Sequence, residues 1–308
     1  IIRSIHCAMP SILRDILRQH ASSLAPEDLS ILLTHVTKRT REYLLAHPEY
    51  ILSNQTYHTL LSLIRRRQRH EPIAYLTGRK ECFGFSFQVD YSTLIPSPET
   101  EILIELVQKK ILKNYSNNER NISLVDVGTG SGCIILSLAK VLSHNHHPGS
   151  LTCFGLDISS NALKRARRNR KELQPMLPVR FLTSDLLTML PQKTVLHTDH
   201  IIIVANLPYL SKTIYTNCPP DVKKYEPKTA LMSDTHGLSH IFRLLRQVKD
   251  IHHTHPSISL DIWLEISPEQ KKRLETFVKN IFETPTIHCH QDLAGKNRII
   301  EICIVPSS

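Results

Sequence analysis

The feature that most constrains the fold is an alternation of short β-branched stretches with helical segments from residue 97 onward. Helical stretches such as 160–173 and 237–251 separate the first five of these strands. The predicted strands cover residues 122–127, 151–156, 179–183, 200–205, 258–266, 286–290 and 298–305. This order predicts an α/β domain with a mostly parallel sheet that is covered on both faces. The last two strands are close in sequence, so they are expected to form a terminal antiparallel hairpin.

A separate helical region precedes this domain over residues 1–70. Its first apolar face holds Ile12, Leu13 and Ile16, and a second helix begins near Pro26 with acidic residues in its first turn. A third helix carries Leu60 and leads into three arginines, and no strand pattern interrupts the three. We therefore expect a small all-helical domain here.

Residues 71–96 differ from both neighbouring regions. Phe83, Phe85, Phe87 and Val89 alternate with small or polar residues, which is the periodicity of a strand. The segment is predicted to be a β-hairpin linker, and the α/β domain is predicted to cover residues 97–308.

The positive charge is concentrated near the N-terminus. Residues 1–70 hold ten Lys and Arg against five acids, which is half of the formal net charge of +10. A basic surface favours an acidic or nucleic-acid-associated partner, and a solvated basic face explains the charge equally well.

The composition also limits the compartment and the chemistry. No apolar run approaches the roughly 18 residues of a membrane helix, and no secretory signal is recognised. The seven cysteines form no C-x-x-C pair, which predicts reduced, mostly buried thiols in a cytoplasmic protein without a disulfide framework. Histidines cluster at 144–147 and 252–255 in predicted loops, without other metal ligands at suitable spacing, so no metal is expected.

A glycine-rich turn follows the strand at 122–127. Gly128, Thr129, Gly130, Ser131 and Gly132 lead into an apolar helix, whose free N–H groups suit a ligand. Cys133 stands where a dinucleotide fingerprint requires glycine, and no lysine follows as in a phosphate loop. The spacing instead resembles the cofactor loop of class I methyltransferases that use S-adenosylmethionine, whose Rossmann-like sheet has seven strands.

The next two strands end in carboxylates. Asp157 follows the strand at 151–156 and suits acceptance of two ribose hydroxyls. Asp185 follows the third strand, where it is expected to accept from an adenine amino group while Leu186 packs on the ring. Both acids could instead cap the helices that follow them.

The fourth strand runs into Asn206, Leu207, Pro208 and Tyr209 and is expected next to the first. The Asn206 side-chain oxygen and the Leu207 carbonyl can accept the two N–H groups of a planar amide or aromatic amine. Two such acceptors aim the nitrogen at the methyl donor and stabilise its developing positive charge. Tyr209 can stack on the planar group. Methyltransferases that modify planar nitrogens carry a similar motif.

The whole chain resembles the release factor glutamine N5-methyltransferases of the PrmC/HemK family. The matching segments, in addition to the cofactor loop, are 71–78, 94–101, 226–231 and 292–298. The resemblance implies an N-terminal domain that docks a protein substrate, and methylation of the glutamine in the Gly-Gly-Gln loop of class-1 peptide release factors. We also expect no membrane association, no direct nucleic-acid substrate and a monomer.

Two positions depart from the family pattern. Leu207 stands where the family usually has proline, and only the carbonyl of this residue is assigned a role. Ser97 stands where the family usually has arginine, which leaves the role of residues 97–101 open.

Two other functions fit parts of the pattern. Asn-Leu-Pro-Tyr is also the form found in rRNA adenine dimethylases, which makes an N6-adenine rRNA methyltransferase the main alternative. In that family, however, the small helical domain follows the catalytic domain, whereas here the helices come first. A binding module without enzymatic activity is the third class, and it would tolerate the loss of Asn206.

Overall fold

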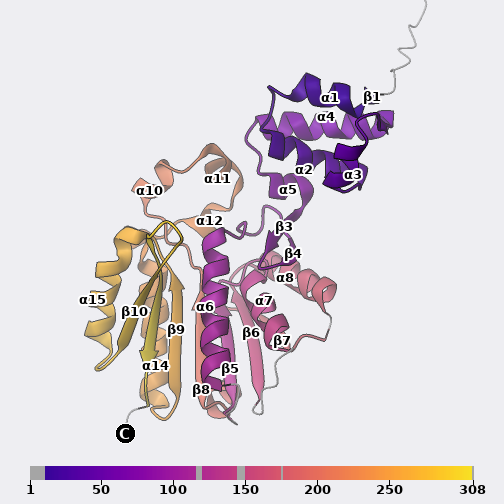
Figure 1. Ribbon diagram of the computed structural model, residues 1–308. Helices are drawn as coiled ribbons and strands as arrows, with labels where there is room; N and C mark the ends of the chain where they lie inside the picture. Colours follow the sequence, from indigo (N-terminus) through magenta and orange to yellow (C-terminus); the bar gives the residue numbers. More distant parts are fainter. Residues whose placement is uncertain (1–10, 116–119, 144–149, 175, 307–308) are drawn as a thin grey trace, which may run out of the picture. The chain divides into compact units, whose positions relative to one another are not determined.

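The structure is a computed structural model that describes residues 11–115, 120–143, 150–174 and 176–306 (Figure 1). The chain forms two compact units. One holds the residues up to Gly78 together with Pro219–Tyr225, and the other holds Arg79–Cys218 and Glu226–Ser308. The first unit therefore extends beyond residue 70, the predicted domain boundary, and includes a segment from the second half of the sequence.

The first unit is built of short helices around a core of buried leucines and isoleucines. Its helices are α1 (Leu13–His20), α2 (Pro26–Thr37), α3 (Arg41–Ala46), α4 (Asn54–Gln68), α5 (Ile73–Thr77) and α11 (Pro220–Tyr225). The predicted helical character is confirmed, but the expectation that no strand interrupts the helices is wrong. β1 (Ser11–Ile12) pairs antiparallel with β2 (Ile51–Leu52), and strands of two residues are too short to show an alternating pattern.

The predicted hairpin is present as β3 (Arg79–Cys82) paired antiparallel with β4 (Phe85–Gln88). Phe83, which was predicted to lie in a strand, lies in the turn instead. Its φ of 51° and the φ of 74° at Gly84 are both left-handed, and this reverses the chain within two residues.

The second unit contains a seven-stranded sheet in the order β10-β11-β9-β8-β5-β6-β7. Its strands are β5 (Ile122–Val127), β6 (Leu151–Asp157), β7 (Val179–Thr183), β8 (His200–Ala205), β9 (Ser259–Glu265), β10 (Thr286–Gln291) and β11 (Asn297–Ile304). The first five pair in parallel, whereas β11 runs antiparallel to both β9 and β10. The predicted fold class and its terminal hairpin are thus confirmed, and β8 does lie beside β5.

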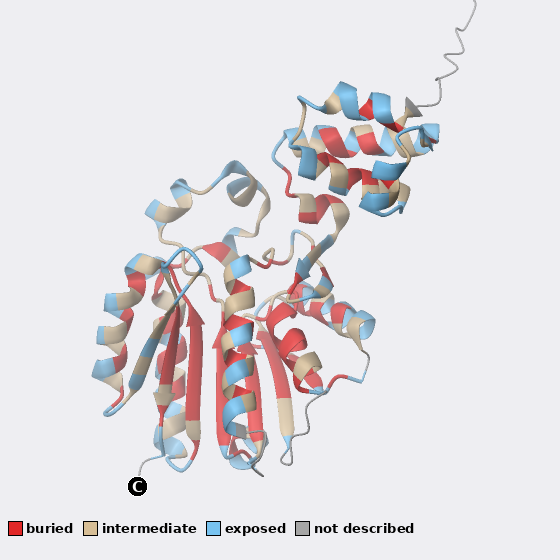
Figure 2. Ribbon diagram, viewed as in Figure 1, coloured by how far each residue is buried: buried red, intermediate tan, exposed pale blue. Residues whose placement is uncertain are grey.

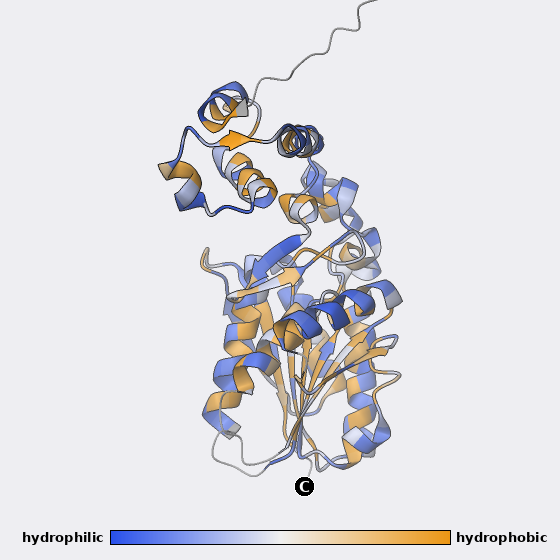
Figure 3. Cartoon of the chain, turned by 90° about the vertical axis from the view of Figure 1, so that its right-hand side faces the viewer, coloured by the Kyte–Doolittle hydropathy of each residue, from blue (hydrophilic) through white to orange (hydrophobic). Residues whose placement is uncertain are grey.

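Helices cover both faces of this sheet, so the central strands are buried along almost their full length (Figures 2 and 3). One face packs against α6 (Pro98–Tyr115), α7 (Cys133–Leu142) and α8 (Ser160–Leu173), and the other against α14 (Ser239–Thr254) and α15 (Lys271–Ile281). The shorter helices are α9 (Gln192–Leu196), α10 (Lys212–Thr216), α12 (Lys228–Leu231), α13 (Asp234–Gly237) and the 3₁₀ helix η1 (Pro268–Gln270).

Several smaller expectations are also resolved. Cys82, Cys133 and Cys153 are buried free thiols, and the other described cysteines are free and partly exposed. His252 and His253 lie in the last turn of α14 instead of a loop, because that helix continues to Thr254. The residues at 144–147 fall outside the described part of the chain. Within the described ranges, no helix is long and apolar enough to cross a membrane.

Candidate active site

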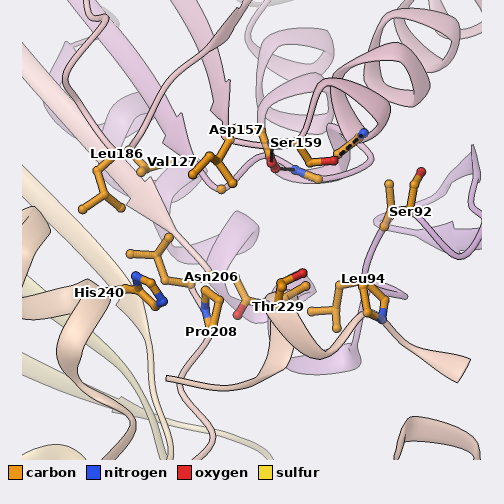
Figure 4. A pocket seen from close by; sticks show the side chains of 18 of the residues that line it. Ser92, Leu94, Val127, Asp157, Ser159, Leu186, Asn206, Pro208, Thr229 and His240 are labelled. Atoms are coloured by element: carbon orange, nitrogen blue, oxygen red, sulfur yellow. Dashed lines mark hydrogen bonds between the residues drawn. The ribbon is translucent and has the colours of Figure 1, made fainter. Parts of the chain in front are cut away.

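A cavity of about 560 Å³ lies at the carboxyl ends of β5, β6, β7 and β8. Figure 4 shows Asp157 and Ser159 on one side of it and Asn206, Pro208 and Thr229 on the opposite side. The predicted site residues that line it are Gly128, Gly130, Asp157, Asp185, Leu186, Asn206, Leu207 and Pro208. Thr129, Ser131, Gly132 and Tyr209 do not line the cavity, although they were predicted as binding residues.

The glycine turn depends on left-handed backbone that other residues rarely adopt. Gly128 has a φ of +76°, and a Cβ at this position would lie 3.0 Å from Cδ2 of Leu207. Gly132 is the N-cap of α7, where a Cβ would crowd Leu136 and Ala166. The turn therefore brings its backbone to the wall of the cavity because Gly128 has no side chain.

Thr129 stabilises the turn from inside the protein. Its hydroxyl donates a 2.6 Å hydrogen bond to Oδ2 of Asp126, and both residues are buried. Burial raises the pKa of Asp126 to about 7, although the bond from Thr129 opposes this shift. We assign Thr129 to the shape of the turn, since its side chain is used within the fold.

Asp157 joins the glycine turn to the start of α8. Its Oδ2 accepts a 2.8 Å hydrogen bond from the N–H of Gly130, and its Oδ1 accepts one of 2.8 Å from the N–H of Ser159. Burial raises the pKa of this carboxyl, and the two N–H donors lower it in part. Each carboxylate oxygen keeps a further lone pair, so Asp157 can still accept from two hydroxyl groups in the cavity.

Asp185 has a partner that its sequence position did not reveal. Arg243 on α14 approaches it, with Nη2 2.5 Å from Oδ2 of Asp185. The next residue, Leu186, has a φ of 56°, and its side chain is buried at the wall of the cavity. His240 lies one turn before Arg243 and also lines the cavity, and burial together with Arg243 lowers its pKa.

Asn206 has one occupied and one free end. Its Nδ2 donates a 3.2 Å hydrogen bond to Oγ1 of Thr100, whereas Oδ1 is buried and has no partner among the described residues. A buried acceptor without a donor is costly, by roughly 1–3 kcal/mol. The residue lines the cavity, so a donor bound there would satisfy this oxygen.

Tyr209 points away from the cavity wall and into a buried network. Its hydroxyl donates a 3.0 Å hydrogen bond to Oε1 of Glu265, and its carbonyl accepts one of 2.8 Å from Nε2 of Gln270. A Cβ on Gly237 would lie 2.0 Å from that carbonyl oxygen, so this close approach requires glycine. Burial raises the pKa of Tyr209 well above its ordinary value, and the neighbouring Glu265 adds to the shift.

Several residues of the site escaped the sequence analysis. Tyr91, Ser92 and Thr93 line the cavity, as do His240 and Arg243, and Glu265 holds Tyr209 from β9. Leu94, Pro227, Thr229 and Ala230 also line it, and they lie in the segments 94–101 and 226–231 that carried the family resemblance. Those segments were the available signal, whereas nothing in the sequence pattern marks His240, Arg243 or Glu265.

Ser97 begins α6. Its Oγ accepts a 3.3 Å hydrogen bond from the N–H of Thr100 and lies 3.2 Å from the hydroxyl oxygen of Thr100. Within the segment 97–101, Ser97 thus holds Thr100, and Thr100 in turn holds Asn206. Within the described residues, no group of three or more His, Cys, Asp or Glu is placed to hold a metal ion.

Comparisons with known proteins match both units of the chain. Residues 12–78 match the family model described as PrmC N-terminal domain, and residues 118–284 match the one described as methyltransferase domain. A protein named release factor glutamine methyltransferase from Buchnera aphidicola subsp. Acyrthosiphon pisum is 35% identical over 87% of this chain and 88% of its own length. A protein of the same name from Clostridium botulinum is 31% identical over 89% of this chain and 90% of its own.

Among solved structures, the catalytic domain of hMettl16 in complex with MAT2A 3'UTR hairpin 6 has a TM-score of 0.53. The sequences are 14% identical, and the match covers 84% of this chain and 86% of that one. At this level of identity, the similarity concerns the fold alone.

Proposed function

Since this chain belongs to the release factor glutamine methyltransferase family, we propose that it methylates the side-chain nitrogen of a glutamine in a peptide release factor, with S-adenosylmethionine as the donor. The observation that carries the proposal is Asn206, which lines the same cavity as the glycine turn and Asp157 and whose buried Oδ1 has no partner among the described residues. We further propose the glutamine of the Gly-Gly-Gln loop of class-1 factors as the target. A monomeric, cytoplasmic enzyme remains an expectation.

The residues of the cavity fit this donor. Gly128 keeps the wall open, because any Cβ there would meet Leu207, and Asp157 offers lone pairs to two ribose hydroxyls. Leu186 provides a buried apolar surface for a base, and Asp185 offers Oδ1 while Arg243 holds Oδ2. When bound, S-adenosylmethionine supplies an electrophilic methyl group on a sulfonium centre.

The chain's own groups orient the nitrogen that is to be methylated. Asn206 Oδ1 accepts one N–H of the glutamine amide, and the Leu207 carbonyl, to which no described residue donates, accepts the other. These two acceptors fix the plane of the amide and stabilise the positive charge that grows on nitrogen. The Leu207 side chain is buried against Gly128, so the departure from proline leaves the carbonyl role intact.

Methylation of an rRNA adenine is the alternative with the same motif. The order of the domains argues against it, because the helical unit precedes the α/β unit. The names of the relatives support a protein substrate.

The test is to incubate the protein with isotopically labelled S-adenosylmethionine and a purified class-1 release factor, and to locate the label by mass spectrometry. We expect one methyl group on the loop glutamine and none on a factor whose loop glutamine is replaced by alanine. Label on ribosomal RNA in a parallel incubation, with an unmodified release factor, would contradict the proposal.

A further inference from the structure

Behind the cavity, a buried carboxylate connects the two polar side chains of the Asn206–Tyr209 motif. Glu265 is 1% exposed, its Oε1 accepts from the Tyr209 hydroxyl at 3.0 Å, and its Oε2 accepts from the Thr100 hydroxyl at 3.1 Å. Thr100 is also 1% exposed and accepts from Nδ2 of Asn206 at 3.2 Å. A single chain of hydrogen bonds thus runs from β9 through α6 to the cavity.

The direction of each bond in this chain follows from the chemistry of the groups. An ionised carboxylate only accepts, so the Thr100 proton must point to Glu265. The Thr100 oxygen then has only lone pairs left, which accept from Nδ2 of Asn206 and from the hydroxyl of Ser97 at 3.2 Å. A reversed Asn206 amide would place its oxygen against those lone pairs, so Nδ2 stays with Thr100 and Oδ1 stays free.

We propose that Glu265 and Thr100 are positioning residues that decide which end of the Asn206 amide faces the substrate. This inference rests on the proposed function, because an acceptor is needed there only if the substrate presents N–H groups. With Oδ1 facing the cavity, the amide accepts from the glutamine NH₂. With Nδ2 facing it, two donors would oppose each other and the glutamine nitrogen would not be oriented toward the methyl group.

Protonation of Glu265 would remove the constraint that fixes the orientation of the Asn206 amide. A neutral carboxyl can donate to Thr100, whose own proton is then free to reach Oδ1 of Asn206 and reverse the amide. Burial raises the pKa of Glu265 to about 7, Glu99 on α6 raises it further, and Tyr209, Thr100 and Arg298 on β11 lower it. Turnover should therefore fall as the pH decreases through about 7, since the carboxylate form is then lost.

The first test compares Thr100→Val, which keeps the shape but removes the hydroxyl, with Thr100→Ser, which keeps the hydroxyl. We expect Thr100→Val to lower kcat by about 10- to 100-fold, with little change in the Kd of the cofactor or in the KM of the release factor. Thr100→Ser should restore most of the rate. Thermal unfolding of both variants checks that the fold is intact.

The second test compares pH profiles of kcat for the wild type and Glu265→Gln. We expect the kcat of the wild type to decrease as the pH falls through about 7. The variant should have a lower kcat that shows no such decrease, because a glutamine cannot accept from the hydroxyls of both Tyr209 and Thr100. Asp126 has a pKa of about 7 as well, so the difference between the two profiles isolates Glu265. An identical acidic decrease in both proteins would contradict the inference.

A third readout does not depend on activity. The side-chain NH₂ signal of Asn206 in a ¹⁵N NMR spectrum, assigned by its absence in Asn206→Ala, should move with pH in step with Glu265 and lose this response in Thr100→Val. Wild-type kcat in Thr100→Val together with an unchanged signal would overturn the inference. A wild type that leaves release factors unmethylated refutes the proposed function instead, while the signal still reports whether Glu265 and Thr100 orient Asn206.

Discussion

At the residue scale, the two ends of the Asn206 side chain have different roles. Its Nδ2 is bound to Thr100, and its buried Oδ1 has no partner among the described residues. Folded proteins rarely leave a buried acceptor without a donor, and a catalytic role or a bound group is among the explanations for such an exception. The role assigned to Asn206 therefore depends on this one oxygen atom. The residues that are proposed to bind the cofactor can be tested separately from it.

Asn206→Ala should abolish most of the turnover and leave cofactor affinity almost unchanged. The loss of one charge-stabilising contact in the transition state costs on the order of 2–4 kcal/mol, or about 10²–10³ in kcat. Methylation rates and calorimetric titration with the cofactor measure the two quantities. Asn217→Ala, at the exposed C-cap of α10, is the matched control, and near-normal activity of Asn206→Ala would remove the assigned role.

Asp157→Asn should weaken cofactor binding by roughly 10- to 100-fold, because hydrogen bonds to a charged acceptor contribute about 1.5–3 kcal/mol. Burial raises the pKa of the Asp157 carboxyl, so the wild type should also bind the cofactor more weakly as the pH falls through that raised value. Calorimetry over a pH series checks both effects. The exposed substitution Asp250→Asn serves as control, and equal affinity in all three proteins would reject the ribose assignment.

At the scale of the element, the turn between β5 and α7 combines two separate demands. Gly128 needs a left-handed backbone and also lies close to Leu207, whereas Gly295 has a similar φ of +74° and a Cβ there would meet nothing within 4 Å. The two glycines therefore separate the cost of backbone strain from the cost of crowding. Strain alone costs about 1–2 kcal/mol per residue.

Gly295→Ala should lower the free energy of unfolding by about 1 kcal/mol, and Gly128→Ala by more, because its Cβ also meets Leu207. Gly128→Ala should weaken cofactor binding too, since the displaced Leu207 lines the cavity. Denaturant unfolding and calorimetry measure these effects. If both variants lost the same stability and bound the cofactor normally, close approach at Gly128 would play no part.

At the scale of the whole molecule, the first compact unit carries half of the formal net charge of +10 although it is much the smaller of the two. Arg65 and Arg69 are exposed at the end of α4 in the first unit, which matches the PrmC N-terminal domain model. A positive surface on a docking domain would accelerate encounter with an acidic partner and would be screened by salt. The proposed role of residues 1–70 in holding the release factor can be tested on this basis.

The double substitution Arg65→Glu and Arg69→Glu should raise the KM for the release factor by about 10-fold at low salt, with kcat and cofactor Kd unchanged. The difference from the wild type should shrink as the salt concentration rises. Lys272→Glu, an exposed charge reversal on α15, is the matched control. Equal KM values for the double variant and the wild type would place the docking surface elsewhere.

The sequence by itself determined the mostly parallel sheet, the neighbouring positions of its first and fourth strands, and the place of the site. Strands such as 122–127 and 200–205 are buried on both faces, so most of their residues are apolar and their limits are clear, and parallel strands must present their carboxyl ends at one edge. The glycine turn, Asp157 and Asn206 could therefore be placed together from their positions in the chain.

Only the tertiary structure decided which of these side chains face the cavity and which groups hold them. Thr129 turns inward to Asp126, Tyr209 binds Glu265, and Arg243 reaches Asp185 from a helix 58 residues away in sequence. The last two contacts join elements that are distant along the chain, so no local pattern marks them. The orientation of the Asn206 amide is also decided by a distant residue, because it depends on the carboxylate of Glu265, which β9 places behind Thr100.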